Sequence, residues 1–368
     1  VTIPPSGPWP PPPPGPGQQP PSWGSQPPWG PPPQRGGNRA KWILGGIALV
    51  VVIGLTVVAT LLVTRDDSGS GEPTASAPPT TSADTSDIAS ADDRGPIGII
   101  TEDPTCTSWG PIAAAFAQGQ NNGWERRDPA LTEGEWTNDQ RNQYAAVASA
   151  LRDTADRSTA LASETPHRVM RELYEQFIAY NRAYAARVET YTPDADHLVR
   201  VSISIASSLN AICDAIAYGA AGARSPLIAR AAPPLGPLSE INLASPSVFL
   251  DSPNAMCAPW LEAAQRFVAE TTDWRAVDPN VPAVDLSPDQ RETNSRASTL
   301  MYSFADETQR LALQTGNAVW QDIATLSAQY RRAYASALMT YAPADNFLQI
   351  AASYLAGSVT EACRAVGA

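Results

Sequence analysis

Residues 180–185 read Tyr-Asn-Arg-Ala-Tyr-Ala, and residues 330–335 read Tyr-Arg-Arg-Ala-Tyr-Ala. The likeness extends well beyond these six positions. A shift of 150 positions places residues 124–213 on residues 274–363 without a gap, and 24 of the 90 aligned pairs are identical. Self-similarity at a fixed spacing is the sequence signature of a structural repeat. The C-terminal part of the chain therefore contains two copies of one unit.

The identical residues gather in short groups along the two copies. The groups are Trp124 with Trp274, Asp128-Pro129 with Asp278-Pro279, Asp139-Gln140-Arg141 with Asp289-Gln290-Arg291, and Thr190-Tyr191 with Thr340-Tyr341. Upstream, a shift of 151 positions aligns Cys106 with Cys257. Each copy therefore begins at a cysteine.

Each copy is predicted to form four helices. The first begins near the first cysteine of the copy, and the second begins at a capping box, Thr137 answered by Gln140 and Ser287 answered by Gln290. The third carries apolar residues three and four positions apart, which places them on one face that we expect to enter the core. In the first copy this face comprises Met170, Leu173, Tyr174, Phe177, Tyr180 and Tyr184. A Tyr-x-Pro step ends the third helix, because proline disfavours helix in the residue before it.

The four cysteines lie one at the start and one at the end of each copy. Four cysteines allow three pairings, and these positions favour Cys106 with Cys213 and Cys257 with Cys363. Each disulfide would join the first helix of a copy to its last and would require an oxidising compartment. Zinc is the alternative, but the sequence has no CxxC or HxxxH spacing that favours it.

The N-terminal part is predicted to contain a transmembrane helix. Residues 43–64 carry no charge and, as a helix, would be roughly 33 Å long, enough to cross a bilayer core. Residues 1–40 are proline-rich and are expected to be a disordered tail, either a docking ligand for an aromatic groove or a plain spacer. Because Arg35, Arg39 and Lys41 precede the span, the positive-inside rule places this tail in the cytoplasm.

The remaining segments complete a domain plan for an all-α protein. Residues 65–98 are rich in Ser, Thr, Pro and Asp and are predicted to be a disordered stalk. Residues 104–222 and 251–368 are predicted to be two tandem four-helix bundles. Residues 223–250 are predicted to be a short ordered linker, with coverage of part of either bundle as the alternative. The C-terminal region would lie outside the plasma membrane.

Charge and motifs exclude several classes of function. Of the 25 basic residues, three lie in residues 1–64, which contain no acid, so residues 65–368 carry 22 basic groups against 37 acidic groups, a net charge of −15. This balance argues against nucleic acid as a partner. Lys41 is the only lysine, which excludes a Walker-type phosphate loop and a lysine Schiff base beyond the span. We expect no catalytic residue, no cofactor and no metal, and hence no enzyme.

Two kinds of residue remain as candidates for a site. His167 and His197 correspond to Asn317 and Phe347 in the second copy, so neither belongs to a repeated site, and surface or helix-end roles are expected. The repeated Tyr-x-Arg-x-Tyr residues are candidates for binding: Tyr180, Arg182, Tyr184, Tyr330, Arg332 and Tyr334. The tyrosines can line an apolar pocket or simply pack in the core. The arginines can clamp an anion or form structural ion pairs.

The order of proline-rich tail, single span, Ser/Thr/Pro stalk and helical C-terminal region resembles the uncharacterised single-pass envelope membrane proteins of mycobacteria and other actinobacteria. The resemblance implies a location in the cell envelope. We therefore expect a non-enzymatic, membrane-anchored interaction or scaffold protein with envelope protein partners. The alternative is an extracytoplasmic module that binds a lipid or another apolar envelope molecule.

Overall fold

The computed structural model describes residues 87–233 and 236–368, and within these ranges every regular element is a helix. The prediction of an all-α fold is confirmed. The predicted tail (residues 1–40), the predicted transmembrane helix (residues 43–64) and the predicted stalk up to residue 86 lie outside the described residues.

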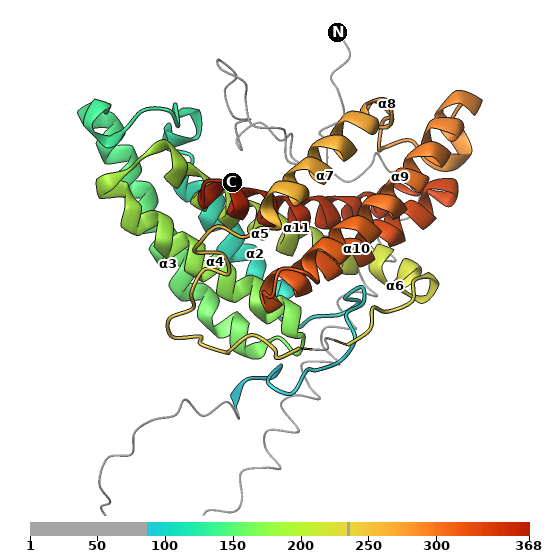
Figure 1. Cartoon of the computed structure of the whole chain (residues 1–368), viewed down its shortest axis with the longest axis horizontal. Helices are drawn as coiled ribbons and strands as arrows, with labels where there is room; N and C mark the ends of the chain where they lie inside the picture. Colours follow the sequence, from blue (N-terminus) through green and yellow to red (C-terminus); the bar gives the residue numbers. More distant parts are fainter. Residues whose placement is uncertain (1–86, 234–235) are drawn as a thin grey trace, which may run out of the picture. The chain divides into compact units, whose positions relative to one another are not determined.

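The first copy contains four long helices and one short one (Figure 1). They are α2 (Cys106–Gly119), α3 (Asn138–Glu164), α4 (Arg168–Arg187), α5 (Asp196–Ala217) and the short α6 (Ala220–Arg224). Turns of 3-10 helix lie at Trp124–Arg126, Glu133–Glu135, Val188–Thr190, Pro193–Ala195 and Ser225–Leu227.

The second copy repeats this order. Its helices are α7 (Cys257–Glu270), the short α8 (Thr272–Arg275), α9 (Pro288–Ala312), α10 (Ala318–Ala337) and α11 (Asn346–Ala365). Its 3-10 turns lie at Ala283–Asp285, Leu338–Thr340 and Pro343–Asp345. The four long helices of the two copies therefore follow in the same order along the chain, whereas α6 has no counterpart among the described residues of the second copy and α8 replaces the 3-10 turn Trp124–Arg126.

Local sequence signals set the starts of the second and third helices. The hydroxyl of Thr137 accepts a hydrogen bond from the Gln140 backbone N–H at 3.2 Å, and Ser287 accepts one from Gln290 at the same distance. Both predicted capping boxes are present, with the glutamine side chain accepting from the cap backbone N–H. Asn317 caps α10 by accepting from the Trp320 N–H at 3.0 Å.

The disulfide pairing is the predicted one. Cys106 is bonded to Cys213 and Cys257 to Cys363, with a Cα–Cα distance of 5.4 Å in each pair. The first disulfide joins α2 to α5, and the second joins α7 to α11. Each copy thus has its first and last helices covalently connected.

The predicted apolar face of α4 is buried in full. The six residues of this face have no exposed surface in the folded chain. The structure adds that α4 is covered on its other sides too, since Arg168, Arg171 and Glu172 are also buried. Periodicity predicted one buried face, whereas α4 is enclosed by several neighbours.

The two copies pack together chiefly through their last helices, α5 and α11, which lie side by side (Figure 1). Helix α4 also contacts α10. At the ends of these helices His197 pairs with Glu361 at 2.7 Å, and Arg224 pairs with Asp345 at 2.7 Å. The buried apolar residues of both copies form one continuous core. The separation into two four-helix bundles therefore stays a prediction.

One described segment, Pro193–Ala217, is long and apolar enough to span a membrane by length and composition. Its most apolar stretch is 67% buried within the protein, and it contains the disulfide-bonded Cys213. Packing of α5 against α11 accounts for this apolar character, so we interpret α5 as a core helix.

Part of the predicted stalk and the linker both contact α4. The predicted disordered stalk runs to residue 98, but within it Ile97 is buried and Asp93 accepts a hydrogen bond from the Arg168 N–H at 2.8 Å. In the predicted linker, the Phe249 N–H donates to Gln176 at 2.7 Å. The reason is that α4 carries buried polar side chains, which these segments satisfy with hydrogen bonds.

Removing either disulfide is expected to destabilise the protein strongly. The bonds close loops with sequence separations of 107 and 106 residues, and the chain-entropy model gives about 4 to 5 kcal/mol for a loop of this length. We expect Cys106→Ala/Cys213→Ala and Cys257→Ala/Cys363→Ala each to lower the thermal unfolding midpoint of the full chain. Equal midpoints for a double variant and the unmodified chain would contradict this.

Candidate functional site

Three aromatic rings form a cage in the first copy, which we call the first cage. Trp124 meets Tyr184 edge to face at 6.0 Å between ring centroids, and Tyr184 meets Tyr191 at 6.4 Å. The Tyr191 hydroxyl donates to the Pro129 carbonyl at 3.2 Å, which ties the end of α4 to the loop after α2.

The same cage is present in the second copy, and we call it the second cage. Trp274 meets Tyr334 at 5.9 Å, and Tyr334 meets Tyr341 at 5.9 Å. The Tyr341 hydroxyl donates to the Pro279 carbonyl at 2.6 Å, as in the first copy. Each repeated Trp, Asp-Pro and Thr-Tyr group of the sequence therefore contributes to a cage wall or its anchor.

An arginine of the chain itself fills the first cage. The Arg127 guanidinium carbon lies 3.4 Å from the centroid of the Trp124 ring, a cation–π contact. Its Nε and Nη2 donate to Asp196 Oδ1 at 2.8 and 2.6 Å. Burial alone would lower the pKa of Arg127, but the charge of Asp196 raises it overall. Arg127 is thus a stacked, ion-paired plug.

Two more rings close the first cage. Trp136 stacks on Tyr144 with 3.7 Å between ring centroids, and Tyr144 meets Trp124 at 6.2 Å. Burial raises the pKa of Tyr144 to about 12, so its hydroxyl stays protonated at neutral pH. Rings and guanidinium together leave the first cage filled.

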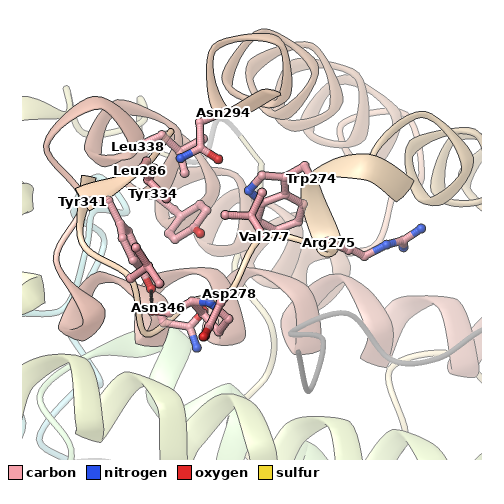
Figure 2. Close-up of a pocket in the computed structure, with 12 residues that line it drawn as sticks. Trp274, Arg275, Val277, Asp278, Leu286, Asn294, Tyr334, Leu338, Tyr341 and Asn346 are labelled. Atoms are coloured by element: carbon pink, nitrogen blue, oxygen red, sulfur yellow. Dashed lines mark hydrogen bonds between the residues drawn. The ribbon is translucent and has the colours of Figure 1, made fainter. Parts of the chain in front are cut away.

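The second cage has lost all four of these filling groups. The positions of Arg127, Asp196, Tyr144 and Trp136 are taken by Val277, Asn346, Asn294 and Leu286. These smaller, neutral residues line a cavity of about 30 Å³ together with the cage rings (Figure 2). The second cage is therefore open where the first is plugged.

A buried polar atom faces this cavity. Asn294 is 3% exposed, and its Oδ1 has no hydrogen-bond partner among the described residues. Figure 2 shows Asn294 facing Tyr334 and Trp274 across the cavity, whereas Arg275 points away from it. A buried acceptor without a partner costs free energy, and a donor that entered the cavity would relieve that cost.

The predicted binding residues are divided among several environments. Tyr184 and Tyr334 are cage walls. Tyr180 packs edge to face on Phe249 at 5.8 Å, and Tyr330 donates its hydroxyl to the Ile100 carbonyl at 3.4 Å. The structure therefore does not gather the four tyrosines into one pocket.

The two repeated arginines form equivalent ion pairs. Arg182 lies 2.8 Å from Asp156, and Arg332 lies 2.7 Å from Asp306. Both pairs join the third helix of a copy to its second helix at a partly exposed position. Their geometry fits the structural role rather than an anion clamp.

The histidines lie at helix starts. His167 occupies the N-cap position of α4 without a side-chain capping hydrogen bond, and its Nε2 is 2.9 Å from the Glu102 carbonyl oxygen. His197 lies in the first turn of α5 and contacts Glu361 of the other copy. Burial alone would raise the pKa of Glu361, but the hydrogen bond to His197 and the charge of Arg364 lower it overall. Within the described ranges, no three His, Cys, Asp or Glu side chains lie together as a metal site would require.

A second polar cluster lies between α4 and α10. Glu172 and Asp322 occupy equivalent positions in the two copies, and Arg168 Nε donates to Asp322 Oδ2 at 2.6 Å. Ser239 of the linker donates to Glu172 at 2.5 Å. Burial, and then the neighbouring charge of Asp322, raise the pKa of Glu172 well above its usual value. This cluster joins the two copies and the linker in the core.

Comparison with known proteins agrees with the extent of the described region. The sequence profile of the family described as mycobacterial ESX-1 associated protein matches residues 88–367. The chain belongs to this family. An uncharacterised protein of Mycolicibacterium smegmatis (strain MKD8) is 44% identical over 335 residues, which cover 91% of this chain and 88% of the relative. No solved structure matches the chain.

The ESX-1-associated family match covers both copies, their cages and the segments that pack on α4. It begins at residue 88, inside the predicted stalk, and this agrees with the packing of residues 87–98 against α4. The sequence shows that the cage walls are repeated residues, but of these it predicts only Tyr184 and Tyr334 as binding residues. It had not indicated Arg127 or Asp196, because these residues differ between the copies.

Removing Arg127 alone should destabilise the full chain more than removing it together with Asp196. Arg127→Val leaves the buried Asp196 with Arg200, 2.6 Å away, as its remaining ion-pair partner, so the cost should stay below the value of about 3 to 5 kcal/mol for a fully uncompensated buried charge. Arg127→Val/Asp196→Asn reproduces the pair present in the second copy and should recover at least about 1 kcal/mol of that loss. Chemical denaturation of the full chain measures both values. The partly exposed Arg182→Val is the control, with an expected cost below about 1 kcal/mol.

Glu172→Gln should change how stability depends on pH. Because the folded-state pKa of Glu172 is raised, its contribution is fully present below the unfolded pKa of about 4.3 and is lost as pH rises. We expect the stability difference between the variant and the unmodified chain to be smallest near pH 4, and the variant to gain about 1 kcal/mol or more over the unmodified chain by pH 8. Exposed Glu189→Gln should show no such divergence. Parallel pH profiles for Glu172→Gln and the unmodified chain would refute the assignment.

Proposed function

We propose that this chain is a non-enzymatic, membrane-anchored interaction protein associated with the mycobacterial ESX-1 secretion system. The observation that carries the proposal is the family match over residues 88–367. Joined to it is the predicted layout of cytoplasmic tail, single span and external helical region. The protein would hold secretion-system components together rather than perform chemistry.

The construction of the described region supports an external location for it. Its four cysteines are joined in two disulfides that connect helices about 100 residues apart in sequence. Such bonds persist in oxidising compartments outside the cytoplasm. This agrees with the orientation that Arg35, Arg39 and Lys41 predict for the span at residues 43–64.

A platform for protein partners also fits the way the helices pack. Both copies share one core, and cross-copy ion pairs lie at both the His197 and the Arg224 ends of the interface. A rigid unit of this kind presents surfaces in fixed relative positions, which lowers the ordering cost of binding.

The alternative, a lipid carrier, gains no support from the cavities found. The cavity of the second cage is about 30 Å³, on the order of two water molecules. A larger one of about 310 Å³ lies between α4, the linker and the start of α10, but its lining is mostly polar and includes Glu175, Gln176 and Glu240. A hydrocarbon chain requires an apolar lining, so protein binding remains the preferred function.

The proposal is tested with a tagged full chain expressed at its native level in a mycobacterium. Protease added to intact cells should remove the region after residue 65 while leaving the N-terminal tail. After detergent extraction, ESX-1 components should co-purify at a fixed ratio, and native mass spectrometry should show protein partners without stoichiometric lipid.

A chain ending at residue 86 is the matched control, because it keeps the tail and the predicted span but lacks the helical region. It should reach the membrane and lose the ESX-1 components. Equal recovery of these components with the control, or a protected C-terminal region in intact cells, would refute the proposal. Bound lipid at one molecule per chain would favour the carrier instead.

A further inference from the structure

We propose that the second cage is a binding site for an arginine side chain presented by a partner protein. The first cage supplies the internal precedent, since there the equivalent tryptophan, Trp124, stacks on the guanidinium of Arg127 beside the equivalent tyrosines. The inference rests on the proposed function for the source of the arginine, but the site itself is argued from the cage geometry.

The walls that receive Arg127 are retained in the second cage. Trp124 and Tyr184 are 6.0 Å apart at 76°, and Trp274 and Tyr334 are 5.9 Å apart at 70°. An indole face arranged in this way attracts a planar cation, and arginine stacks there better than lysine. What the second copy lacks is the plug, because Val277 stands where Arg127 stands in the first.

The groups that face the cavity suit a donor. A guanidinium carries five N–H donors and no acceptor. Asn294 Oδ1 is a buried acceptor without a partner among the described residues, and Asn346, at the position of Asp196, offers a second amide at the cavity wall. Asp278 lies at the cavity wall and supplies negative charge, while Arg275 points away (Figure 2). The cavity, on the order of two waters in size, fits the head of one side chain.

The rim of the second cage indicates that the ligand belongs to a protein. Val284 is 85% exposed and Met339 is 60% exposed, and both lie on 3-10 turns that contact each other beside Tyr341. The equivalent positions in the first copy hold Gly134 and Glu189. Val284 and Met339 thus lie on the turns next to the cavity-lining residues Leu286 and Leu338, and exposed apolar residues at such a place form a surface that a partner would cover.

The negative net charge of the chain after the predicted span favours a basic partner. Residues 65–368 carry 22 basic and 37 acidic groups, so the region attracts cations over a distance. A basic segment with apolar residues beside its arginine would gain binding free energy from three sources: the cage, the exposed apolar residues beside it, and the long-range attraction of the negative net charge.

The test uses the full chain, labelled with 5-fluorotryptophan, in detergent. The Trp274 resonance is assigned from Trp274→Phe, and the probes are Nα-acetyl methylamides of arginine, citrulline and norleucine, followed by acetyl-Leu-Arg-Leu-amide. Citrulline has nearly the shape of arginine without its charge. We expect arginine to shift the Trp274 resonance saturably, citrulline to bind at least about tenfold more weakly, and the tripeptide to bind more tightly than arginine alone.

A plug variant supplies the decisive comparison. Val277→Arg/Asn346→Asp transplants the first-copy pair and should abolish binding of every probe while raising the unfolding midpoint. Leu313→Arg adds a positive charge to an exposed position at the end of α9 and should leave binding unchanged. Val284→Ser/Met339→Ser should remove only the advantage of the tripeptide.

Norleucine binding as tightly as arginine, or no response to any probe, would overturn the inference. So would undiminished binding by the plug variant. Because the measurement uses purified chain and defined probes, it is independent of ESX-1. If arginine binds but ESX-1 components do not co-purify, the site is supported and the proposed function is refuted. If ESX-1 components co-purify but arginine does not bind, the proposed function is supported and the site is refuted.

Discussion

The structure depends on the packing of α5 against α11, the last helices of the two copies. These helices are buried along most of their length, and each is bonded by a disulfide to the first helix of its own copy. The contact between α5 and α11 therefore also positions α2 and α7, the helices that are disulfide-bonded to them. Removal of apolar surface from water at this contact provides the main driving force for joining the copies. The ion pairs at the two ends of this contact fix how far the copies can slide along each other, since His197 and Arg224 each pair with an acidic residue of the second copy.

Once α5 and α11 are paired, the third helices are brought together as well, and their polar residues must then be satisfied inside the core. Glu172 and Asp322 are equivalent residues that approach each other because the copies face one another, and Arg168 lies beside both. Asp93, in the segment before α2, and Ser239, in the linker, supply further partners, while Arg168 Nη2 and Glu172 Oε2 have none among the described residues. These hydrogen bonds explain why two stretches of loop-like composition are ordered here.

Features encoded by short segments could be predicted from sequence. The capping boxes at Thr137 and Ser287, the apolar face of α4 and the cysteine pairing all follow from local spacing or from the repeat. The enclosure of α4 could not be predicted, because its neighbours lie elsewhere in the chain. Nor could the second cage, whose wall and floor residues come from four separated stretches between Trp274 and Asn346. The repeat identified the shared walls, but the site lies at positions where the copies differ.

The sequence differences between the two cages occur together, as expected if a buried charge and its partner must be present or absent as a pair. Losing Arg127 alone would have left the buried carboxylate at the Asp196 position without its principal partner, and such a charge is strongly destabilising. In the second copy the arginine and the carboxylate are both replaced, by Val277 and Asn346, so no buried charge is left behind. Tyr144 is likewise replaced by the smaller Asn294, which opens space rather than refilling it. The open space at these positions costs stability, since a cavity in a core is destabilising. The second cage keeps its aromatic walls, has the neutral residues Val277, Asn294 and Asn346 where the first cage has its filling groups, and lies beside exposed apolar residues. This is the arrangement expected of a site that receives its cation from another chain.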